Sequence, residues 1–329
     1  MSKINVFWFR RDLRLDDNIG LYQSSKSGVK FLPIFIFDQS SLKNLPSKKD
    51  SRVQFIHQNL KMIKDKLQEY GSDLKVYFDT PEKAWEKICQ EFEVGAVYTN
   101  EDYEPYAIKR DKKVSKFLSR NGIDFKTFKD QCIFAKDDIL KKDGKPYTVY
   151  TPYKNQWLAR LQPENIASVS NKKYFDNLLP VDAQKLISLE ELGFESESEL
   201  KYARIIKRKI LDEYEEKRDY PALNGTSKLG LHLRFGTVSV RKCAQAGYHA
   251  KNLTWLSELI WREFFMQILY HFPHAEKKAF KAKYENIDWI NSKKDFKRWC
   301  EGKTGYPIVD AGMRELYETG FMHNRVRMV

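Results

Sequence analysis

The sequence lacks the features that mark several broad classes of protein. It has no apolar run close to the roughly 18 to 20 residues that a membrane-spanning helix needs. Its N-terminal segment has neither the apolar stretch nor the small-residue cleavage site of a secretory signal. The four cysteines, Cys89, Cys132, Cys243 and Cys300, are far apart and form no CxxC pair, so a disulfide framework or a cysteine metal site has no support. These absences predict a soluble, cytoplasmic protein.

Motifs for three common kinds of ligand site are also missing. No GxGxxG occurs, which disfavours a dinucleotide site of the usual kind. Gly302 begins a Gly-Lys-Thr sequence, but Lys297 stands where a P-loop needs its first glycine. Pro273 interrupts the helix that would align His271 and His274 on a metal ion. We therefore expect no P-loop and no metal.

What the sequence has is positive charge in its second half. Lys and Arg number 58 and Asp and Glu 45, a formal net charge of +13. The first 200 residues contain 33 basic and 30 acidic side chains, whereas the remaining 129 contain 25 and 15, a net of +10. Such a surface attracts polyanions, of which nucleic acid is the commonest, although a lysine-rich surface that maintains solubility is the simpler alternative.

The first 130 residues alternate short apolar runs with amphipathic stretches. Arg52–Tyr70, Pro81–Phe92 and Tyr103–Arg120 have apolar positions at helical spacing. Because strands that alternate with helices form parallel sheets, we predict an α/β fold with a doubly wound, Rossmann-like sheet of five parallel strands. The predicted strands are Ile4–Phe9, Val29–Phe37, Leu74–Phe78, Ala96–Thr99 and Ile123–Phe128.

The character of the chain changes after this region. Residues 160–200 are polar and poorly periodic, and beyond Glu199 no strand pattern remains. We therefore predict an α/β domain over residues 1–130, an interdomain connection over 131–199 and an all-α domain over 200–329. The predicted helices of the last domain are Leu200–Tyr214, Trp255–His271, Asp295–Cys300 and Val309–Met328.

Four segments combine residue types that suggest chemistry. The first, FWFRRDLRLDDN, starts at Phe7, and its simplest interpretation is a network of ion pairs at the end of a strand. The second, TSKLGLHLRFG, starts at Thr226. Hydroxyls and free N–H groups of Thr226 and Ser227 at a helix start would suit a phosphate, and ordinary helix capping is the alternative.

The third segment, ELIWREFF, starts at Glu258. Helical spacing places Glu258, Trp261 and Arg262 on one face, where a core aromatic beside a surface ion pair is the alternative to a binding site. The fourth runs from GKTGYPIVDAGMR, which starts at Gly302, to HNRVRM, which ends at Met328.

In this order the four segments resemble the DNA photolyase/cryptochrome family, over essentially the whole chain. The fourth is most similar to class I photolyases, which repair cyclobutane pyrimidine dimers, whereas (6-4) photolyases have a histidine-rich stretch there. The resemblance implies an FAD in the helical domain and an antenna chromophore, a folate or a deazaflavin, in the α/β domain. It also implies a monomer that binds damaged DNA without reading its sequence.

The resemblance assigns roles to individual positions. It implies that Glu258, Asn324 and Trp289 take part in catalysis, with Trp289 as the outer member of an electron-transfer chain of tryptophans. The implied FAD-binding residues are Tyr214, Thr226, Ser227, Lys228, Leu229, Gly230, Trp255 and Arg327. The implied lesion-binding residues are Glu258, Trp261, Arg262, Phe265, Asn324, Arg325 and Met328.

General chemistry agrees with these roles. A dimer within a duplex is out of reach, so it must be flipped out of the base stack. Trp261 offers a flat apolar surface for it and Met328 a polarisable one. Glu258 can form a hydrogen bond with the pyrimidine edge and stabilise the charge that develops there.

The sequence departs from the family pattern in three ways, and two alternative functions are also compatible with it. Gly230 stands where relatives commonly have serine, and Phe321 where a relative has tryptophan. Relatives continue beyond the position of Val329, so we expect the chain to be a fragment of a photolyase. A cryptochrome-type photoreceptor that binds FAD without repair would share most of the motifs, and a DNA-binding α/β protein without pigment would share the charge.

Overall fold

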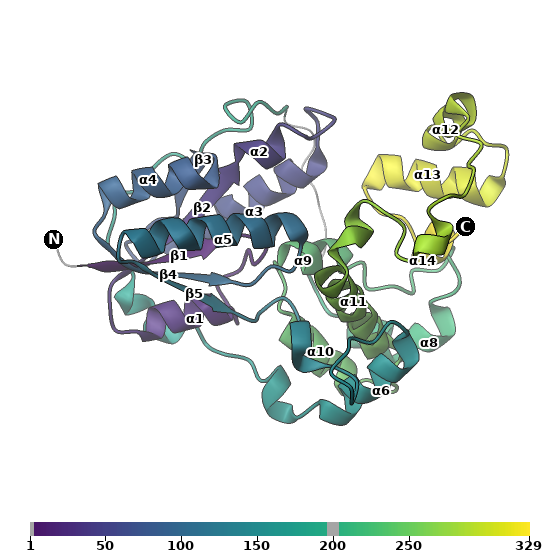
Figure 1. Ribbon diagram of the computed structural model, residues 1–329, viewed down its shortest axis with the longest axis horizontal. Helices are drawn as coiled ribbons and strands as arrows, with labels where there is room; N and C mark the ends of the chain where they lie inside the picture. Colours follow the sequence, from purple (N-terminus) through teal and green to yellow (C-terminus); the bar gives the residue numbers. More distant parts are fainter. Residues whose placement is uncertain (1–2, 196–203) are drawn as a thin grey trace.

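A computed structural model, which describes residues 3–195 and 204–329, shows an α/β domain beside a helical domain (Figure 1). Five parallel strands form one sheet in the order β3-β2-β1-β4-β5. This confirms the predicted class, a doubly wound five-stranded sheet followed by helices. The strands are β1 (Ile4–Phe9), β2 (Phe31–Asp38), β3 (Lys75–Asp79), β4 (Val94–Asn100) and β5 (Asp124–Phe128).

The central strand β1 is buried on both faces, and each face has its own core. Phe7 and Phe9 pack with α1 and α3, whereas Val6 and Trp8 pack with α4 and α5. The split follows from the alternation of side chains along a strand. The helices of this domain are α1 (Ile19–Lys26), α2 (Gln39–Leu42), α3 (Ser51–Gln68), α4 (Pro81–Glu91) and α5 (Pro105–Arg120).

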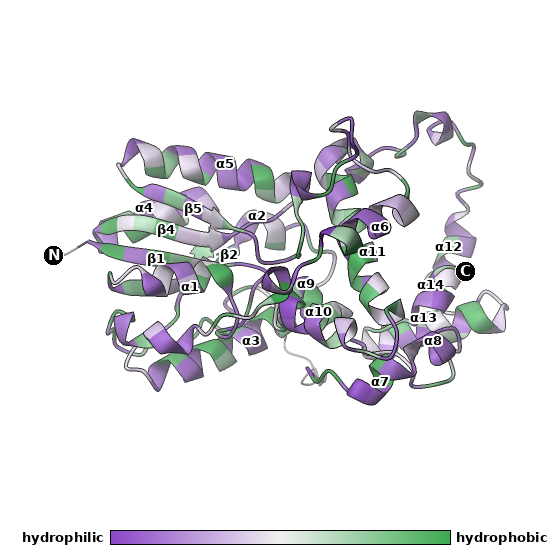
Figure 2. Ribbon diagram, turned by 90° about the horizontal axis from the view of Figure 1, so that it is seen from below, coloured by the Kyte–Doolittle hydropathy of each residue, from purple (hydrophilic) through white to green (hydrophobic). Residues whose placement is uncertain are grey.

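The helical domain is built around α11, which packs against α6 and α10. Hydrophobic and hydrophilic residues alternate along α11 in Figure 2. Among the helices of the described residues, none is long and apolar enough to cross a membrane. The helices are α6 (Tyr150–Arg160), α7 (Arg208–Asp212), α8 (Tyr214–Lys217), α9 (Gly230–Phe235), α10 (Val240–Tyr248), α11 (Thr254–His271), α12 (Lys293–Cys300), α13 (Pro307–Thr319) and α14 (Asn324–Arg327).

Two of the predicted helices are wrong in extent. Val309–Met328 is not one helix, because Gly320 adopts a left-handed conformation (φ 69°) that ends α13, and the His323 side chain then caps α14. The prediction of Leu200–Tyr214 falls partly on residues 200–203, outside the described residues. In the part that is described, α7 ends at Asp212 and a separate short helix, α8, follows.

The segment predicted as an interdomain connection contributes to both domains. Tyr153 and Trp157 of α6 are buried in the helical core. Further along, Phe175, Leu178 and Leu192 are buried in the core beneath the sheet. The domain bounds at residues 130 and 199 stay a prediction. The segment also contains the 3₁₀ turns Lys136–Asp138, Pro163–Ile166 and Lys172–Asn177, and Pro273–Glu276 and Ala282–Tyr284 follow in the helical domain.

A buried network of four charges joins the two domains. Asp130, just after β5, accepts hydrogen bonds from Arg14 (Nη2 to Oδ2, 2.7 Å) and from Arg241 of α10 (Nη2 to Oδ1, 2.9 Å). Arg241 also pairs with Asp17 (Nε to Oδ1, 3.1 Å), and the hydroxyl of Ser239 donates to the same carboxylate. All four charged side chains are more than nine-tenths buried. The ion-pair interpretation of FWFRRDLRLDDN is confirmed, with partners in both domains.

A close contact between the backbones of the two domains reinforces the joint between them, by which we mean the buried network of Arg14, Asp17, Asp130 and Arg241. Gly236 ends α9 in a left-handed conformation (φ 62°), and a Cβ at this position would lie 2.3 Å from the carbonyl oxygen of Arg11. The N–H of Leu13 donates to the carbonyl of Phe235 (3.0 Å). The first and second motif segments therefore touch, and only glycine fits between them.

The network predicts that substitution of Arg241 lowers the free energy of unfolding much more than substitution of its neighbour Lys242. Arg241→Met removes a buried cation and leaves Asp17 and Asp130 under-compensated, which should lower the free energy of unfolding by about 3–5 kcal/mol. Lys242→Met is the control. It removes an ion pair with Asp16 in which both side chains are about half exposed, and should cost less than about 1 kcal/mol. Urea unfolding of both variants measures this, and equal destabilisation would contradict it.

The same network predicts a dependence on pH. Burial alone would raise the pKa of Asp130, but Arg14 and Arg241 outweigh it and hold that pKa below its ordinary value of 3.8. The resulting stability is fully present above that ordinary value and is lost as the pH falls through the lower folded pKa. The stability difference between wild type and Arg241→Met should therefore narrow in acid, and a difference independent of pH would contradict this.

Candidate functional site

Two predicted site residues, Glu258 and Arg325, lie at the ends of a row of alternating charges, and a third, Tyr214, lies beside it. Glu258 of α11 pairs with Arg218, which follows α8 (Oε1 to Nη1, 2.5 Å). Asp219 pairs with Arg325 of α14 (Oδ1 to Nε, 2.6 Å) and also faces Arg218 at 3.6 Å. The guanidinium of Arg218 lies 5.3 Å from the ring centroid of Tyr214. The row Glu258–Arg218–Asp219–Arg325, here the charge row, therefore joins the third motif segment to the fourth through two residues that lie outside every motif segment.

The environment of the charge row keeps Tyr214 protonated. Burial, followed by the negative charge of Glu258, raises the pKa of the Tyr214 hydroxyl to about 12. At neutral pH this hydroxyl remains able to donate a hydrogen bond to an anionic or carbonyl group.

Arg262, one helical turn beyond Glu258, faces a different region. Its Nη1 donates to the carbonyl of Gln131 (2.6 Å) and its Nη2 to the carbonyl of Leu233 (3.2 Å). Burial lowers the pKa of Arg262, yet a guanidinium stays charged at neutral pH. The helix face thus holds an acid, an aromatic and a guanidinium as predicted, but Arg218 and not Arg262 is the partner of the acid.

Trp261 is the middle ring of a stack. Tyr150 of α6 lies almost parallel to it, with ring centroids 3.5 Å apart and an interplanar angle of 8°. Phe265 lies 5.5 Å away at 22° and is 62% exposed. The most exposed aromatic surface of the stack therefore belongs to Phe265.

A cavity of about 390 Å³ lies beside α9, and we name it the basic cavity. The ammonium group of Lys228 lies 4.8 Å from the ring centroid of Phe321, and Arg327 comes from α14. None of the lining residues is acidic, so the cavity suits an anion such as a diphosphate. Its lining residues are Ser51, Arg52, Lys228, Gly230, Leu231, Arg234, Gly320, Phe321, Met322 and Arg327.

The prediction that Thr226 and Ser227 lie at the start of a helix is wrong. Thr226 and Ser227 do not begin a helix, because Lys228 adopts a left-handed conformation (φ 52°) and α9 starts only at Gly230, without a side-chain cap. The hydroxyl of Ser227 instead lies 3.4 Å from the indole nitrogen of Trp255. Within this segment, the first residue to line the basic cavity is Lys228.

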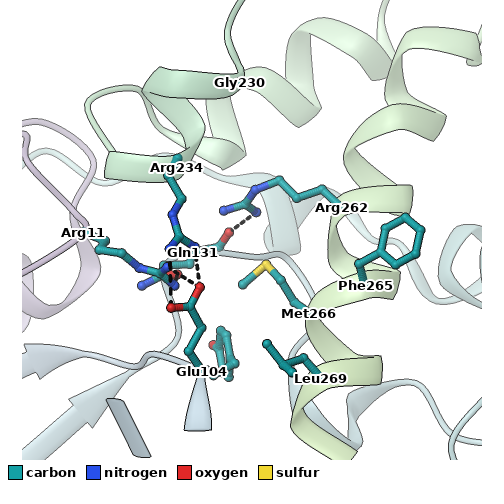
Figure 3. Close-up of a pocket in the computed structure, with 10 residues that line it drawn as sticks. Arg11, Glu104, Gln131, Gly230, Arg234, Arg262, Phe265, Met266 and Leu269 are labelled. Atoms are coloured by element: carbon teal, nitrogen blue, oxygen red, sulfur yellow. Dashed lines mark hydrogen bonds and ion pairs between the residues drawn. The ribbon is translucent and has the colours of Figure 1, made fainter. Parts of the chain in front are cut away.

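A second cavity, of about 410 Å³, lies between the two domains, and we name it the interdomain cavity (Figure 3). Glu104 of the α/β domain pairs with Arg11 (2.7 Å) and with Arg234 of α9. Burial would raise the pKa of Glu104, but Arg234 and Arg11 lower it to about 2, so it is ionised at neutral pH. The lining residues are Arg11, Tyr103, Glu104, Gln131, Gly230, Arg234, Arg262, Phe265, Met266 and Leu269.

The predicted site residues are therefore divided among three places. Arg262 and Phe265 line the interdomain cavity, Lys228 and Arg327 line the basic cavity, and Gly230 lines both. The charge row contains Glu258 and Arg325. Leu229 and Trp255 are buried in the helical core. Trp289 and Met328 are largely exposed, and the amide nitrogen of Asn324 lies 3.8 Å from the sulfur of Met328.

Sequence reasoning missed Arg218, Arg52 and the Glu104–Arg234 pair. Arg218 is flanked by Asp219 in a short polar stretch that shows no periodicity, so nothing local distinguishes it from a solvated arginine. Arg52 lies in the first turn of α3 in the α/β domain, and only the folded chain brings it to α9 and α14.

Comparisons with known proteins identify the family. Residues 5–171 match the family described as DNA photolyase, and residues 255–329 match the FAD binding domain of DNA photolyase. The chain is 32% identical to the deoxyribodipyrimidine photo-lyase of Synechococcus sp., over 98% of this chain and 72% of that protein. It is also 32% identical to that of Escherichia coli, over 99% of this chain and 73% of that protein.

Solved structures show the same fold. A bacterial class III photolyase from Agrobacterium tumefaciens superimposes with a TM-score of 0.85 at 27% identity, over 100% of this chain and 71% of that one. An archaeal photolyase from Sulfolobus tokodaii with two FAD molecules gives a TM-score of 0.77 at 32% identity, over 98% and 73%. The fold, the motif order and these matches place the chain in the DNA photolyase family.

Proposed function

We propose that this protein repairs cyclobutane pyrimidine dimers in DNA with light, using FAD in its helical domain as the electron donor. The observation that carries the proposal is the basic cavity, which lies beside α9 and is bounded by Arg327 of α14. Family membership and the similarity to deoxyribodipyrimidine photo-lyases support the same reaction.

The residues at the basic cavity fit FAD. Lys228, Arg52 and Arg327 provide positive charge for its diphosphate, and Gly230 leaves open space, since a Cβ there would meet nothing within 4 Å. We assign the remaining contacts to Tyr214, Thr226 and Ser227. Leu229 and Trp255 are buried in the helical core, where the indole N–H of Trp255 donates to the hydroxyl of Ser227, and we assign them a supporting role behind the FAD. When bound, FAD supplies the light-absorbing electron donor, which no side chain can provide.

The charge row and the aromatic stack would bind the lesion. Glu258 would form a hydrogen bond with the flipped-out pyrimidine edge, and Arg218 keeps a positive charge beside it. Trp261 and Met328 offer apolar contact, and Asn324 and Arg325 lie at the adjacent end of α14. Arg262 and Phe265 would contact the lesion from the interdomain side.

The charge of the helical domain suits DNA whose sequence does not matter. Its net charge of +10 over residues 201–329 would hold phosphates without reading bases. A repair enzyme needs this property, because damage occurs at any sequence.

We place the antenna chromophore in the interdomain cavity. Arg11 and Arg234 outnumber Glu104, the one acidic residue of the lining, and they lie beside an apolar wall of Met266 and Leu269. This combination suits a flat ring with an acidic tail, as in a folate or a deazaflavin. Arg262 and Phe265 of the same lining stay assigned to the lesion.

A cryptochrome-type photoreceptor is the alternative, and Glu258→Ala distinguishes it. If Glu258 acts on the lesion, the substitution should lower the number of dimers split per absorbed photon by about 10-fold or more, as expected for the loss of one hydrogen bond of about 1.5–3 kcal/mol to a charged group. FAD content should stay as in the wild type. Glu318→Ala, an exposed acid in α13, is the control. An unchanged yield in Glu258→Ala would favour the photoreceptor.

Gly230→Ser tests the cofactor assignment. The added Cβ has open space, and its hydroxyl would enter the basic cavity. One additional hydrogen bond of about 1 kcal/mol should tighten FAD binding roughly fivefold. Gly230→Ala adds the Cβ without the hydroxyl and should leave the affinity near the wild-type value. Titration of the apoprotein with FAD measures both, and equal affinities of the serine and alanine variants would contradict the assignment.

Met266→Glu tests the antenna assignment. Met266 lines the interdomain cavity and is absent from the lining of the basic cavity. A carboxylate there would repel an acidic tail, so the substitution should reduce the content of a second pigment while FAD content is retained. Absorption spectra of the purified proteins report both pigments. Parallel loss of both, or retention of both, would argue against this location.

A further inference from the structure

Tyr150 stacks on Trp261 of α11, and neither the motif segments nor the proposed function gives it a role. Tyr150 is held at two points. Its ring covers one face of Trp261, with centroids 3.5 Å apart, and its hydroxyl donates to the carbonyl of Ser257 (2.8 Å). Ser257 precedes Trp261 by four residues, so both anchors lie on the same helix, one turn apart. Burial raises the pKa of the Tyr150 hydroxyl, which therefore remains a donor.

The element that carries Tyr150 is itself fixed by a buried anchor. Trp157 of α6 donates its indole N–H to the carboxylate of Glu263 on α11 (2.6 Å). The backbone N–H groups of Ile133 and Phe134 donate to the same carboxylate. With three donors on one buried acceptor, α6 cannot slide along α11 without leaving polar groups unpaired.

We propose that Tyr150 is a positioning residue for Trp261. It holds the indole plane in place before DNA arrives and closes one of its faces, so that a flipped-out lesion meets only the remaining indole surface and Phe265. The inference rests on the proposed function, since it takes Trp261 as a lesion contact. Fixing the ring in advance removes the entropy cost of ordering it on binding, which strengthens recognition of the lesion without a new contact.

The experiment compares two tyrosines of the same segment. Tyr150→Leu removes the stack, whereas Tyr147→Leu is a matched control, since Tyr147 packs on Tyr153 in the same core. Tyr150→Phe keeps the ring and should restore most of the wild-type behaviour. A lost aromatic pair predicts that Tyr150→Leu weakens binding of dimer-containing DNA by about three- to tenfold. Binding of undamaged DNA and the behaviour of Tyr147→Leu should stay near wild type.

The double-variant comparison isolates the pair. In a Trp261→Leu background, Tyr150→Leu should have no further effect on lesion binding, because the ring that it positions is gone. A loss of the same size in both backgrounds would overturn the inference, and so would equal losses in Tyr150→Leu and Tyr147→Leu.

A measurement without DNA separates this inference from the proposed function. With 5-fluorotryptophan incorporated, the fluorine resonance of Trp261 is identified by its absence in Trp261→Leu. It should shift and broaden in Tyr150→Leu and stay unchanged in Tyr147→Leu. An unmoved resonance in Tyr150→Leu overturns the positioning role whatever the DNA result. A wild-type chain that shows no preference for dimer-containing DNA, with the resonance shifting as expected, would instead count against the proposed function alone.

Discussion

The structure depends on four charges that are buried at the joint of its two domains. Asp17, Asp130, Arg14 and Arg241 have lost nearly all contact with water, and ions in that situation are tolerated only in a geometry that pairs every one of them. These ion pairs therefore hold together the loop after β1, the segment after β5 and the start of α10. Gly236 extends the constraint to α9, because its backbone touches that of Arg11.

This joint determines where both cavities lie. Gly230 and Arg234, one turn apart on α9, line the basic cavity and the interdomain cavity alike. Arg234 is tied across the domain boundary to Glu104. Neither cavity belongs to one domain alone, since Arg52 of α3 also lines the basic cavity. A pigment in either site would therefore depend on the relative placement of the domains as much as on its immediate neighbours.

Much of the fold can be predicted from local sequence patterns. The distribution of the site residues among the charge row and the two cavities cannot. The inner strands β1, β2 and β4 were predictable because they are buried apolar runs bounded by turns, whereas the edge strands β3 and β5 are only partly buried. The charged residues after β1 were correctly interpreted as ion pairs. The spacing of Glu258 and Arg262 indicates a shared helix face, yet it cannot show that Arg218 supplies the ion pair. Similarly, Tyr150 lies far from Trp261 in the sequence, so their stacking depends on packing that no local pattern contains.

The most direct test of the account is dimer loss in light and in darkness. The purified full chain, supplied with FAD and a reductant, would be mixed with DNA that contains thymine dimers, and the remaining dimers would be counted with and without illumination. The account predicts that dimers disappear only in the illuminated sample and only when FAD is bound. Dimer loss of equal extent in darkness, or none under light with FAD bound, would contradict it.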